Sequence, residues 1–289
     1  MTFSKHQLTK TGSTALFVLL WSSGGIFSAW GLKHATPLAF LTLRFTVALI
    51  ALGLFGLTRG ELLPVRGTRL RVIVTGAFIC GGYSICYLIA LGKGATPGTL
   101  AVILGIQPIL TLLLFERRLS TERFVGLALA MSGLFLVVYQ DLDLLHQTRI
   151  GTCFALGALA CVTTGAILQK GIDQPPLALL PLQYTTSLFL CVAAIPYGSF
   201  SFECTTEFLV PLLWLGLVIS VVAQLLLYNL IRSGDLVNVT SLFYLVPPTT
   251  AALDFLLLGH SLPALTAIGM VTILAGLLLI FRARVKASA

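Results

Sequence analysis

The stretch Pro37-Leu38-Ala39-Phe40-Leu41-Thr42-Leu43-Arg44 decides the fold, because it recurs 139 positions later as Pro176-Leu177-Ala178-Leu179-Leu180-Pro181-Leu182-Gln183. Two glycines near the end of the first half, Gly126 and Gly133, recur in the same way as Gly269 and Gly276. The glycines recur after 143 positions and the proline stretch after 139, a difference of about one helical turn. A gap in the first copy just after Pro108 accounts for this difference. The sequence therefore predicts two related halves, residues 1–140 and 141–289.

The composition is that of a membrane protein. Apolar residues make up 57% of the 289-residue chain, charged residues only 10%, and the mean hydropathy is +1.00. A soluble domain carries about 25% charged residues, so this chain has too few of them to cover a surface that faces water. The apolar runs are continuous and lack the alternation of a transmembrane β-strand, which favours helices over a barrel.

The apolar runs have the length of membrane-spanning helices, since about 20 residues at ~1.5 Å each cross a hydrocarbon core of ~30 Å. The linkers between them leave no room for a separate soluble domain. Ten spans are predicted, at residues 12–32, 37–57, 72–92, 97–115, 124–140, 151–170, 177–198, 208–231, 237–258 and 264–281.

Five spans in each half is an odd number, so the second half must cross the membrane in the opposite sense to the first. The predicted fold is an all-α membrane protein of ten transmembrane helices, arranged as two inverted-topology five-helix repeats. Inverted repeats are typical of secondary transporters, whose halves rock about a binding site near the middle of the bilayer. A duplicated bundle that serves as a non-transporting receptor is the less favoured interpretation.

Lysine and arginine residues indicate the orientation, because they are enriched in cytoplasmic segments. With the N-terminus in the cytoplasm, 14 of the 18 lysines and arginines fall inside, three fall outside, and Arg44 lies within a span. We therefore expect a multi-pass protein of the inner (plasma) membrane with both termini in the cytoplasm. The formal charge of +8 reflects this topology and not nucleic-acid binding. The run from Gly12 to Leu32 is too long for a signal-peptide core, so we interpret it as the first span.

Three motifs resemble those of the EamA-type carriers of the drug/metabolite transporter superfamily. Leu43-Arg44-Phe45 is similar to the Leu-Arg-Phe signature in the second span of these carriers. Glu116-Arg117-Arg118-Leu119-Ser120 resembles their Gly-Glu-Arg-Leu-Ser turn, and Pro247 through Leu257-Leu258-Gly259-His260 resembles their Pro…Leu-Leu-Gly-Glu stretch. The resemblance covers essentially the whole chain. It departs from the family at His260, where the family has glutamate, and at Arg117, where the glutamate is displaced by one position.

The resemblance implies a secondary transporter that exports amino acids or other small metabolites by alternating access. Within the superfamily the chain looks most like the amino-acid exporters, with a preference for aromatic cargo. Multidrug efflux of lipophilic cations is the alternative, and a membrane-embedded enzyme is less favoured. We expect no catalytic residues, no cofactor and no metal, because acidic clusters, metal-ligand spacing and a phosphate loop are all missing from the sequence. The six cysteines carry no pattern that changes this expectation.

Apart from Lys170 at the very end of the sixth span, two charged residues lie within the predicted spans, where a charge is costly and should face protein or a watery cavity. Arg44 lies roughly 10 Å below the outer end of its span. It is either an anchor for a substrate carboxylate, part of an outer gate, or a long side chain that reaches the outer surface. Asp254 lies about one turn from the outer end of the ninth span. It either binds a substrate ammonium, carries a coupling proton, pairs with Arg44, or reaches interfacial water.

Uncharged polar and aromatic residues at membrane depth supply the other candidates, and several of them share a helical face with a second candidate. Tryptophan and tyrosine also form interfacial belts, and serine also serves only helix contacts. Trp30 and Tyr139, near span ends, are expected in such belts. The predicted substrate-binding residues are Trp21, Ser22, Tyr83, Tyr87, Gln107, Gln224, Tyr228 and Tyr244, with Arg44 and Asp254 as the charged anchor or gate.

Prolines mark two spans as interrupted helices. Gln107 directly precedes Pro108, and Tyr244 lies about one turn before the pair Pro247-Pro248. Proline removes an amide donor and frees backbone carbonyls for neighbouring groups or cargo. Interrupted helices at matching positions of two repeats point to a binding site at the midplane.

The expected partners are a small-molecule substrate and the lipid bilayer, and no nucleic acid. Spans 124–140 and 264–281 carry the matched glycines and few polar groups, so we expect them to be scaffold or contact helices. The chain is predicted to be a monomer, or a homodimer through these two spans. An aromatic chamber with few charges suits a zwitterion with an apolar side chain better than a lipophilic cation, which favours buried acids.

Overall fold

The structure is a computed structural model that describes residues 5–59, 63–115, 121–139, 149–258 and 263–287. Within these ranges the chain is helical, apart from loops and an isolated bridge between Ala35 and Phe202. The first repeat contains α1 (Lys5–Gly31), α2 (Pro37–Arg59), η1 (Arg66–Thr68), α3 (Arg69–Gly76), η2 (Ala77–Gly82), α4 (Tyr83–Gly92), α5 (Pro97–Leu104), α6 (Gln107–Phe115) and α7 (Thr121–Val138).

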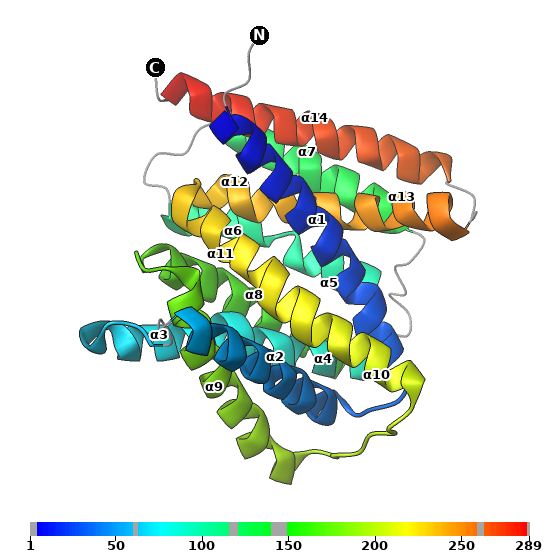
Figure 1. Ribbon diagram of the computed structural model, residues 1–289. Helices are drawn as coiled ribbons and strands as arrows, with labels where there is room; N and C mark the ends of the chain where they lie inside the picture. Colours follow the sequence, from blue (N-terminus) through cyan, green and yellow to red (C-terminus); the bar gives the residue numbers. More distant parts are fainter. Residues whose placement is uncertain (1–4, 60–62, 116–120, 140–148, 259–262, 288–289) are drawn as a thin grey trace.

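The second repeat contains α8 (Arg149–Lys170), α9 (Pro176–Ala194), η4 (Ile195–Tyr197), α10 (Thr206–Leu213), η5 (Trp214–Ala223), α11 (Gln224–Ser233), α12 (Leu236–Ser241), η6 (Leu242–Leu245), α13 (Val246–Leu258) and α14 (Ala264–Ala287). The helix α1 begins, and α14 ends, at the same end of the bundle (Figure 1). The predicted boundary between the halves, after residue 140, lies outside the described residues.

Nine helical segments of the described chain are long and apolar enough to cross a membrane. The remaining predicted span, 237–258, consists of α12, η6 and α13 in succession, so it is not one continuous helix. The seventh predicted span, 177–198, extends too far, because α9 ends at Ala194 and Pro196 lies in the short turn η4 that follows. The predicted all-α fold of ten membrane helices is confirmed, with interruptions in the fourth and ninth spans.

The inverted relation of the repeats is clearest where α7 packs against α14 (Figure 1). A Cβ placed on Gly126 would lie 2.8 Å from the carbonyl oxygen of Gly276, and one placed on Gly133 would lie 2.7 Å from that of Gly269. The two helices are therefore antiparallel, and each glycine faces the counterpart of the other glycine, as a twofold relation between the repeats requires. Small residues allow helix backbones to approach this closely in a membrane. These glycines are buried within the chain, so this face is not free for the predicted homodimer contact.

The same symmetry relates two further close contacts. A Cβ placed on Gly76 of α3 would lie 2.6 Å from the Cα atom of Gln183 in α9. The corresponding glycine of the second repeat, Gly216 in η5, faces α2, where its Cβ would lie 2.7 Å from Cγ1 of Val47. The second span of each repeat thus packs against the third span of the other repeat.

The third span of each repeat contains a π-helical segment. The segment η2 ends directly before Tyr83, and η5 ends directly before Gln224. Tyr83 and Gln224 are 141 positions apart, the same offset that relates Tyr87 to Tyr228. π-Helical turns interrupt the regular hydrogen-bond ladder and are frequent at functional sites. Both repeats therefore carry the same local distortion beside candidate residues.

The fourth span of each repeat is interrupted, as the prolines predict. In the first repeat α5 and α6 are separated by a turn at Gly105 and Ile106, and in the second repeat η6 separates α12 from α13. The two interruptions meet, since the hydroxyl of Tyr244 in η6 donates to the carbonyl of Gly105 at 2.6 Å. This bond gives a partner to a carbonyl released by the break and joins the repeats near the centre of the molecule.

Candidate functional site

A cavity of about 820 Å³ lies between the repeats, and residues from all ten spans contribute to its lining. This volume is within the range of about 300–1,000 Å³ that is typical of small-molecule sites. The lining extends to Lys33, Pro97 and Pro263, which lie at the ends of spans on the side away from the chain termini. The cavity therefore reaches the surface on that side.

Polar contacts hold the helix ends together on the side of the termini. The Nζ atom of Lys170, the last residue of α8, donates to the carbonyls of Ile231 at 2.8 Å and Gly234 at 2.6 Å, at the end of α11. Arg123 of α7 lies 3.3 Å from the carboxylate of Asp235, which also caps α12. The ion pair connects the first repeat to the second on this side.

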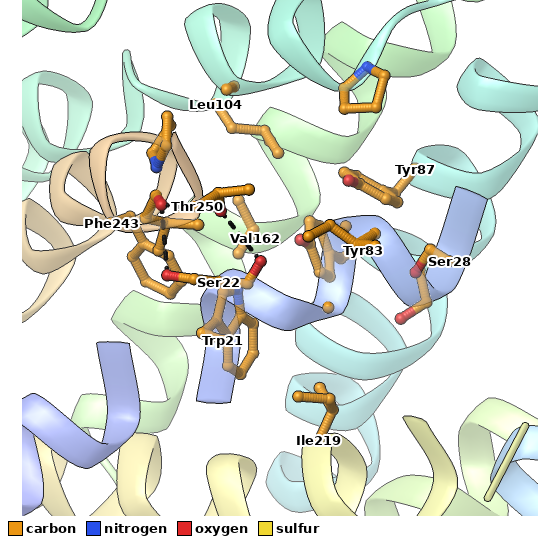
Figure 2. Close-up of a pocket in the computed structure, with 18 of the residues that line it drawn as sticks. Trp21, Ser22, Ser28, Tyr83, Tyr87, Leu104, Val162, Ile219, Phe243 and Thr250 are labelled. Carbon is orange, nitrogen blue, oxygen red and sulfur yellow. Dashed lines mark hydrogen bonds between the residues drawn. The ribbon is translucent and has the colours of Figure 1, made fainter. Parts of the chain in front are cut away.

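Aromatic side chains form two walls of the cavity (Figure 2). Trp21 of α1 meets Phe243 of η6 edge-on, with ring centroids 5.4 Å apart. Tyr83 and Tyr87 lie one turn apart on α4, with ring centroids 5.8 Å apart. Aromatic rings offer large apolar surfaces, and tyrosine adds a hydroxyl group that can bind a polar ligand. The two walls can therefore hold an apolar group and hydrogen-bond a polar one.

Ser22 both lines the cavity and joins two helices (Figure 2). Its hydroxyl donates to the carbonyl of Val18 at 2.6 Å and also lies 3.3 Å from the carbonyl oxygen of Val246. The hydroxyl of Thr250 in turn lies 3.1 Å from the Ser22 carbonyl oxygen. Ser22 therefore ties α1 to the start of α13, where the prolines remove backbone donors.

Arg44 of α2 brings a positive charge into the cavity. Its Nε atom donates to the hydroxyl of Ser220 at 2.8 Å, and the hydroxyl of Tyr184 donates to the carbonyl of the same serine. Ser220 is fully buried in η5, so its position is fixed. Within the described part of the chain, Arg44 forms no ion pair. The side chain of Asp254 lies outside the described part, so its pairing with Arg44 stays a prediction.

Two of the predicted substrate-binding residues, Tyr228 and Tyr244, are fully buried and are absent from the cavity lining. The Tyr228 hydroxyl lies 3.4 Å from Sγ of Cys80, and the Tyr244 hydroxyl is bonded to Gly105. Both side chains therefore hold helices together. The predicted residues that line the cavity are Trp21, Ser22, Tyr83, Tyr87, Gln107, Gln224 and Arg44.

The residues predicted from the sequence do not include Tyr184, Ser220 and Phe243. Tyr184 corresponds to Phe45 in the repeat, and their rings pack with centroids 5.3 Å apart, so the repeat alignment contained a signal for it. Ser220 lies in an apolar run that carries no such signal. Trp30 also lines the cavity, and its place in an interfacial belt stays a prediction.

Two inverted five-helix repeats around a central cavity define a membrane carrier. The sequence model of the EamA-like transporter family matches residues 13–139 and, separately, residues 149–282. The chain therefore belongs to the EamA-like transporter family, and it is a transporter and not an enzyme. The turn 116–120 and His260, which carry the departures from the family pattern, lie outside the described residues.

The chain is similar to two proteins named "probable amino-acid metabolite efflux pump". One, from Salmonella typhimurium (strain LT2), is 28% identical over 97% of this chain and 98% of its own length. The other, from Escherichia coli (strain K12), is 27% identical over 93% of both chains. An uncharacterized transporter of Bacillus subtilis (strain 168), YvbV, is 25% identical over 95% of this chain and 90% of its own. A crystal structure at 17% identity, with a TM-score of 0.79 over 97% of this chain and 99% of that one, has the same fold.

Proposed function

We propose that this protein is a secondary transporter that exports amino acids or related small metabolites, with a preference for aromatic ones, across the inner (plasma) membrane. The observation that carries the proposal is an aromatic-walled cavity that contains Arg44 and has no aspartate or glutamate among its described lining residues. An apolar side chain fits against the aromatic walls, and a carboxylate fits beside the guanidinium. The names of the Salmonella and Escherichia coli relatives support amino-acid cargo.

The charges of the lining disfavour the alternative cargo, lipophilic cations. Arg44 lies deep in the cavity and Lys33 lies at its mouth, and both repel a positive ligand. Carriers of cations are expected to offer a buried carboxylate instead. The described part of the lining has none to offer.

The proposed alternating access rests on a difference between the two membrane sides of the protein: the cavity reaches the surface on one side and polar contacts hold the helix ends together on the other. With both termini in the cytoplasm, as the lysine and arginine distribution favours, the cavity is open to the outside and the Arg123–Asp235 pair helps to close the inside. Export then requires an inward-facing state in which this pair separates and the outer mouth closes. The inverted repeats support such an exchange, because each repeat can adopt the conformation of the other.

Counterflow in proteoliposomes tests the proposed cargo. Vesicles containing the purified protein are loaded with unlabelled phenylalanine and offered labelled phenylalanine outside, without a pH gradient. We expect labelled uptake above that of vesicles without protein. No uptake of phenylalanine, by protein that elutes as a folded species, would refute the aromatic preference, and no uptake of any amino acid would refute amino-acid cargo.

Two substitutions test the placement of the site. Tyr83→Ala and Gln224→Ala remove cavity-lining groups and should each lower counterflow while the yield of folded protein stays the same. Tyr139→Ala is the matched control, because Tyr139 is 55% exposed and does not line the cavity. Unchanged transport in both cavity variants would contradict this placement.

A further inference from the structure

The tyrosines around the cavity divide into two groups by what their hydroxyl groups bind. Three hydroxyls bond to protein atoms. Tyr184 donates to the carbonyl of Ser220, Tyr244 donates to the carbonyl of Gly105, and the Tyr228 hydroxyl bonds to the sulfur of Cys80. Tyr83 and Tyr87 line the cavity and are only partly buried, and their hydroxyls have no hydrogen-bond partner among the described residues. These two hydroxyls are therefore available to a ligand.

A hydrogen bond from one nitrogen atom, Nε, holds the guanidinium of Arg44 in place. Its Nε atom donates to Ser220, which is itself fixed by Tyr184 on its carbonyl side. The terminal nitrogens of Arg44 have no partner within the described ranges, and the side chain lines the cavity. An arginine with a fixed plane and free terminal donors is suited to bind a carboxylate through two parallel hydrogen bonds.

Both tyrosines lie on a helix that packs against the helix of this arginine. The helix α2 carries Arg44 and contacts α4, which carries Tyr83 and Tyr87, and all three side chains line the cavity. The Tyr87 hydroxyl also lies beside Gly25 of α1, 3.9 Å from the position a Cβ would take, so the absent side chain leaves space around it. Figure 2 shows the two tyrosines projecting side by side from α4. Two helices in contact thus bring to the cavity a cation and two hydroxyls that no described residue binds.

The described part of the cavity lining offers no comparable group for a positive charge. Lys33 and Arg44 line it, and its described lining includes no aspartate or glutamate. An ammonium group in this cavity therefore meets aromatic faces, hydroxyls and carbonyls, but no described counter-ion. Among the described residues, the carboxylate of an amino acid therefore has a charged partner and its ammonium group has none.

We propose that Arg44, Tyr83 and Tyr87 form a carboxylate subsite, and that the cargo is recognised by its carboxylate and an aromatic body and not by its amino group. The proposal rests on the transport function proposed above and refines it. The substrate class then includes aryl-substituted monocarboxylates that lack an amine. The aromatic body packs against Trp21 and Phe243, on the other aromatic wall.

Thermal unfolding of the purified full-length protein, with three probes of the same size, tests the subsite. The probes are L-phenylalanine, 3-phenylpropanoate and 2-phenylethylamine, which carry both charged groups, the carboxylate alone and the amine alone. A ligand at free concentration L that binds the folded state stabilises it by RT ln(1 + L/Kd), so at equal probe concentration a higher affinity gives a larger rise in the unfolding temperature. We expect similar affinities for the first two probes, and an affinity at least about tenfold weaker for the amine, since charge-assisted bonds to the carboxylate are lost.

Variants assign the effect to the proposed residues. Arg44→Gln, which introduces the residue found at the matching position 183, should weaken 3-phenylpropanoate binding about tenfold or more. Arg44→Lys keeps the charge but lacks the planar fork, so its affinity for 3-phenylpropanoate should lie between those of Arg44→Gln and the unchanged protein. Tyr83→Phe and Tyr87→Phe should each weaken binding roughly three- to tenfold without changing the unfolding temperature of the free protein. Tyr139→Phe serves as the control that changes nothing.

The outcomes separate the subsite from the transport function. Binding of phenylalanine and phenylethylamine without phenylpropanoate would overturn the subsite and leave amino-acid cargo in place. Binding of phenylpropanoate alone would support the subsite and reject amino-acid cargo, and no stabilisation by any probe would overturn both. An Asp254→Asn variant that loses phenylalanine binding and keeps phenylpropanoate binding would also overturn the proposal, because the amine would then have a dedicated partner.

Discussion

Replacing Gly133 by alanine should destabilise the protein, because the new methyl group would collide with the backbone of α14. The Cβ atom would lie 2.7 Å from the carbonyl oxygen of Gly269 and 2.7 Å from the amide nitrogen of Ile273. Both contacts are with backbone atoms, so no side-chain rotation relieves them. The helices α7 and α14 would have to move apart by several tenths of an ångström along their most extensive contact.

Two opposing effects set the size of the loss. Overpacking a tight contact costs about 1–3 kcal/mol. Alanine in place of glycine inside a helix returns roughly 0.5–1 kcal/mol, because it restricts the unfolded chain. The expected net loss is about 1 kcal/mol, and at most about 2.5 kcal/mol. At roughly 2–4 °C per kcal/mol for chains of comparable size, the unfolding temperature should fall by several degrees.

The assay is thermal unfolding of the variant in detergent, beside Gly53→Ala as a matched control. Gly53 lies within α2, and a Cβ at this position would meet no atom within 4 Å. The control substitution should therefore keep or raise the unfolding temperature. An equal change in both variants, or a more stable Gly133→Ala protein, would refute the argument that the glycine is required for close approach.

Two further substitutions test residues that hold the cavity in shape. Tyr244→Phe leaves the Gly105 carbonyl without its hydroxyl donor, so the unfolding temperature should fall by the equivalent of about 1–3 kcal/mol, and an unchanged value would contradict the hydrogen bond. Tyr228→Ala removes a fully buried ring and should cost about 3–5 kcal/mol, which low yield and early unfolding would report. A stable Tyr228→Ala protein that has lost transport would instead assign this residue to the substrate route.

The overall fold is predictable from the sequence because its determinants are local or repeated. Continuous apolar runs have the length of spans, and the recurrence of the Pro37 stretch at Pro176 identifies the repeats. Pro108 and the pair at 247 predict the interrupted helices, since proline removes specific backbone hydrogen bonds. The π-helical segments were not predictable in this way. Gly81-Gly82 is a weak sign of the first, but η5 consists of ordinary apolar residues with one glycine and one serine.

The candidate site is only partly predictable, because periodicity places a side chain on a helical face without saying what lies opposite. Tyr87 and Tyr228 occupy equivalent positions in the repeats and similar depths in the membrane. Tyr87 nevertheless lines the cavity, whereas the hydroxyl of Tyr228 is hydrogen-bonded to the sulfur of Cys80. The difference depends on neighbours that are distant in the sequence. The hydrogen bond from Tyr244 to Gly105 likewise joins residues that are far apart in the sequence, 139 positions from each other. No local pattern contains this information.

The meeting of α7 with α14 restricts how far the two repeats can diverge. Gly133 faces Gly269, the counterpart of Gly126, and Gly126 faces Gly276, the counterpart of Gly133, so the symmetry of the repeats exchanges these two contacts. A larger residue gained by either copy obstructs both, and neither copy is free to change alone. Away from the axis this restriction ends, and position 44 carries arginine where its counterpart at 183 carries glutamine. A duplicated protein can in this way keep a symmetric frame while it places a single charge on one side of its cavity.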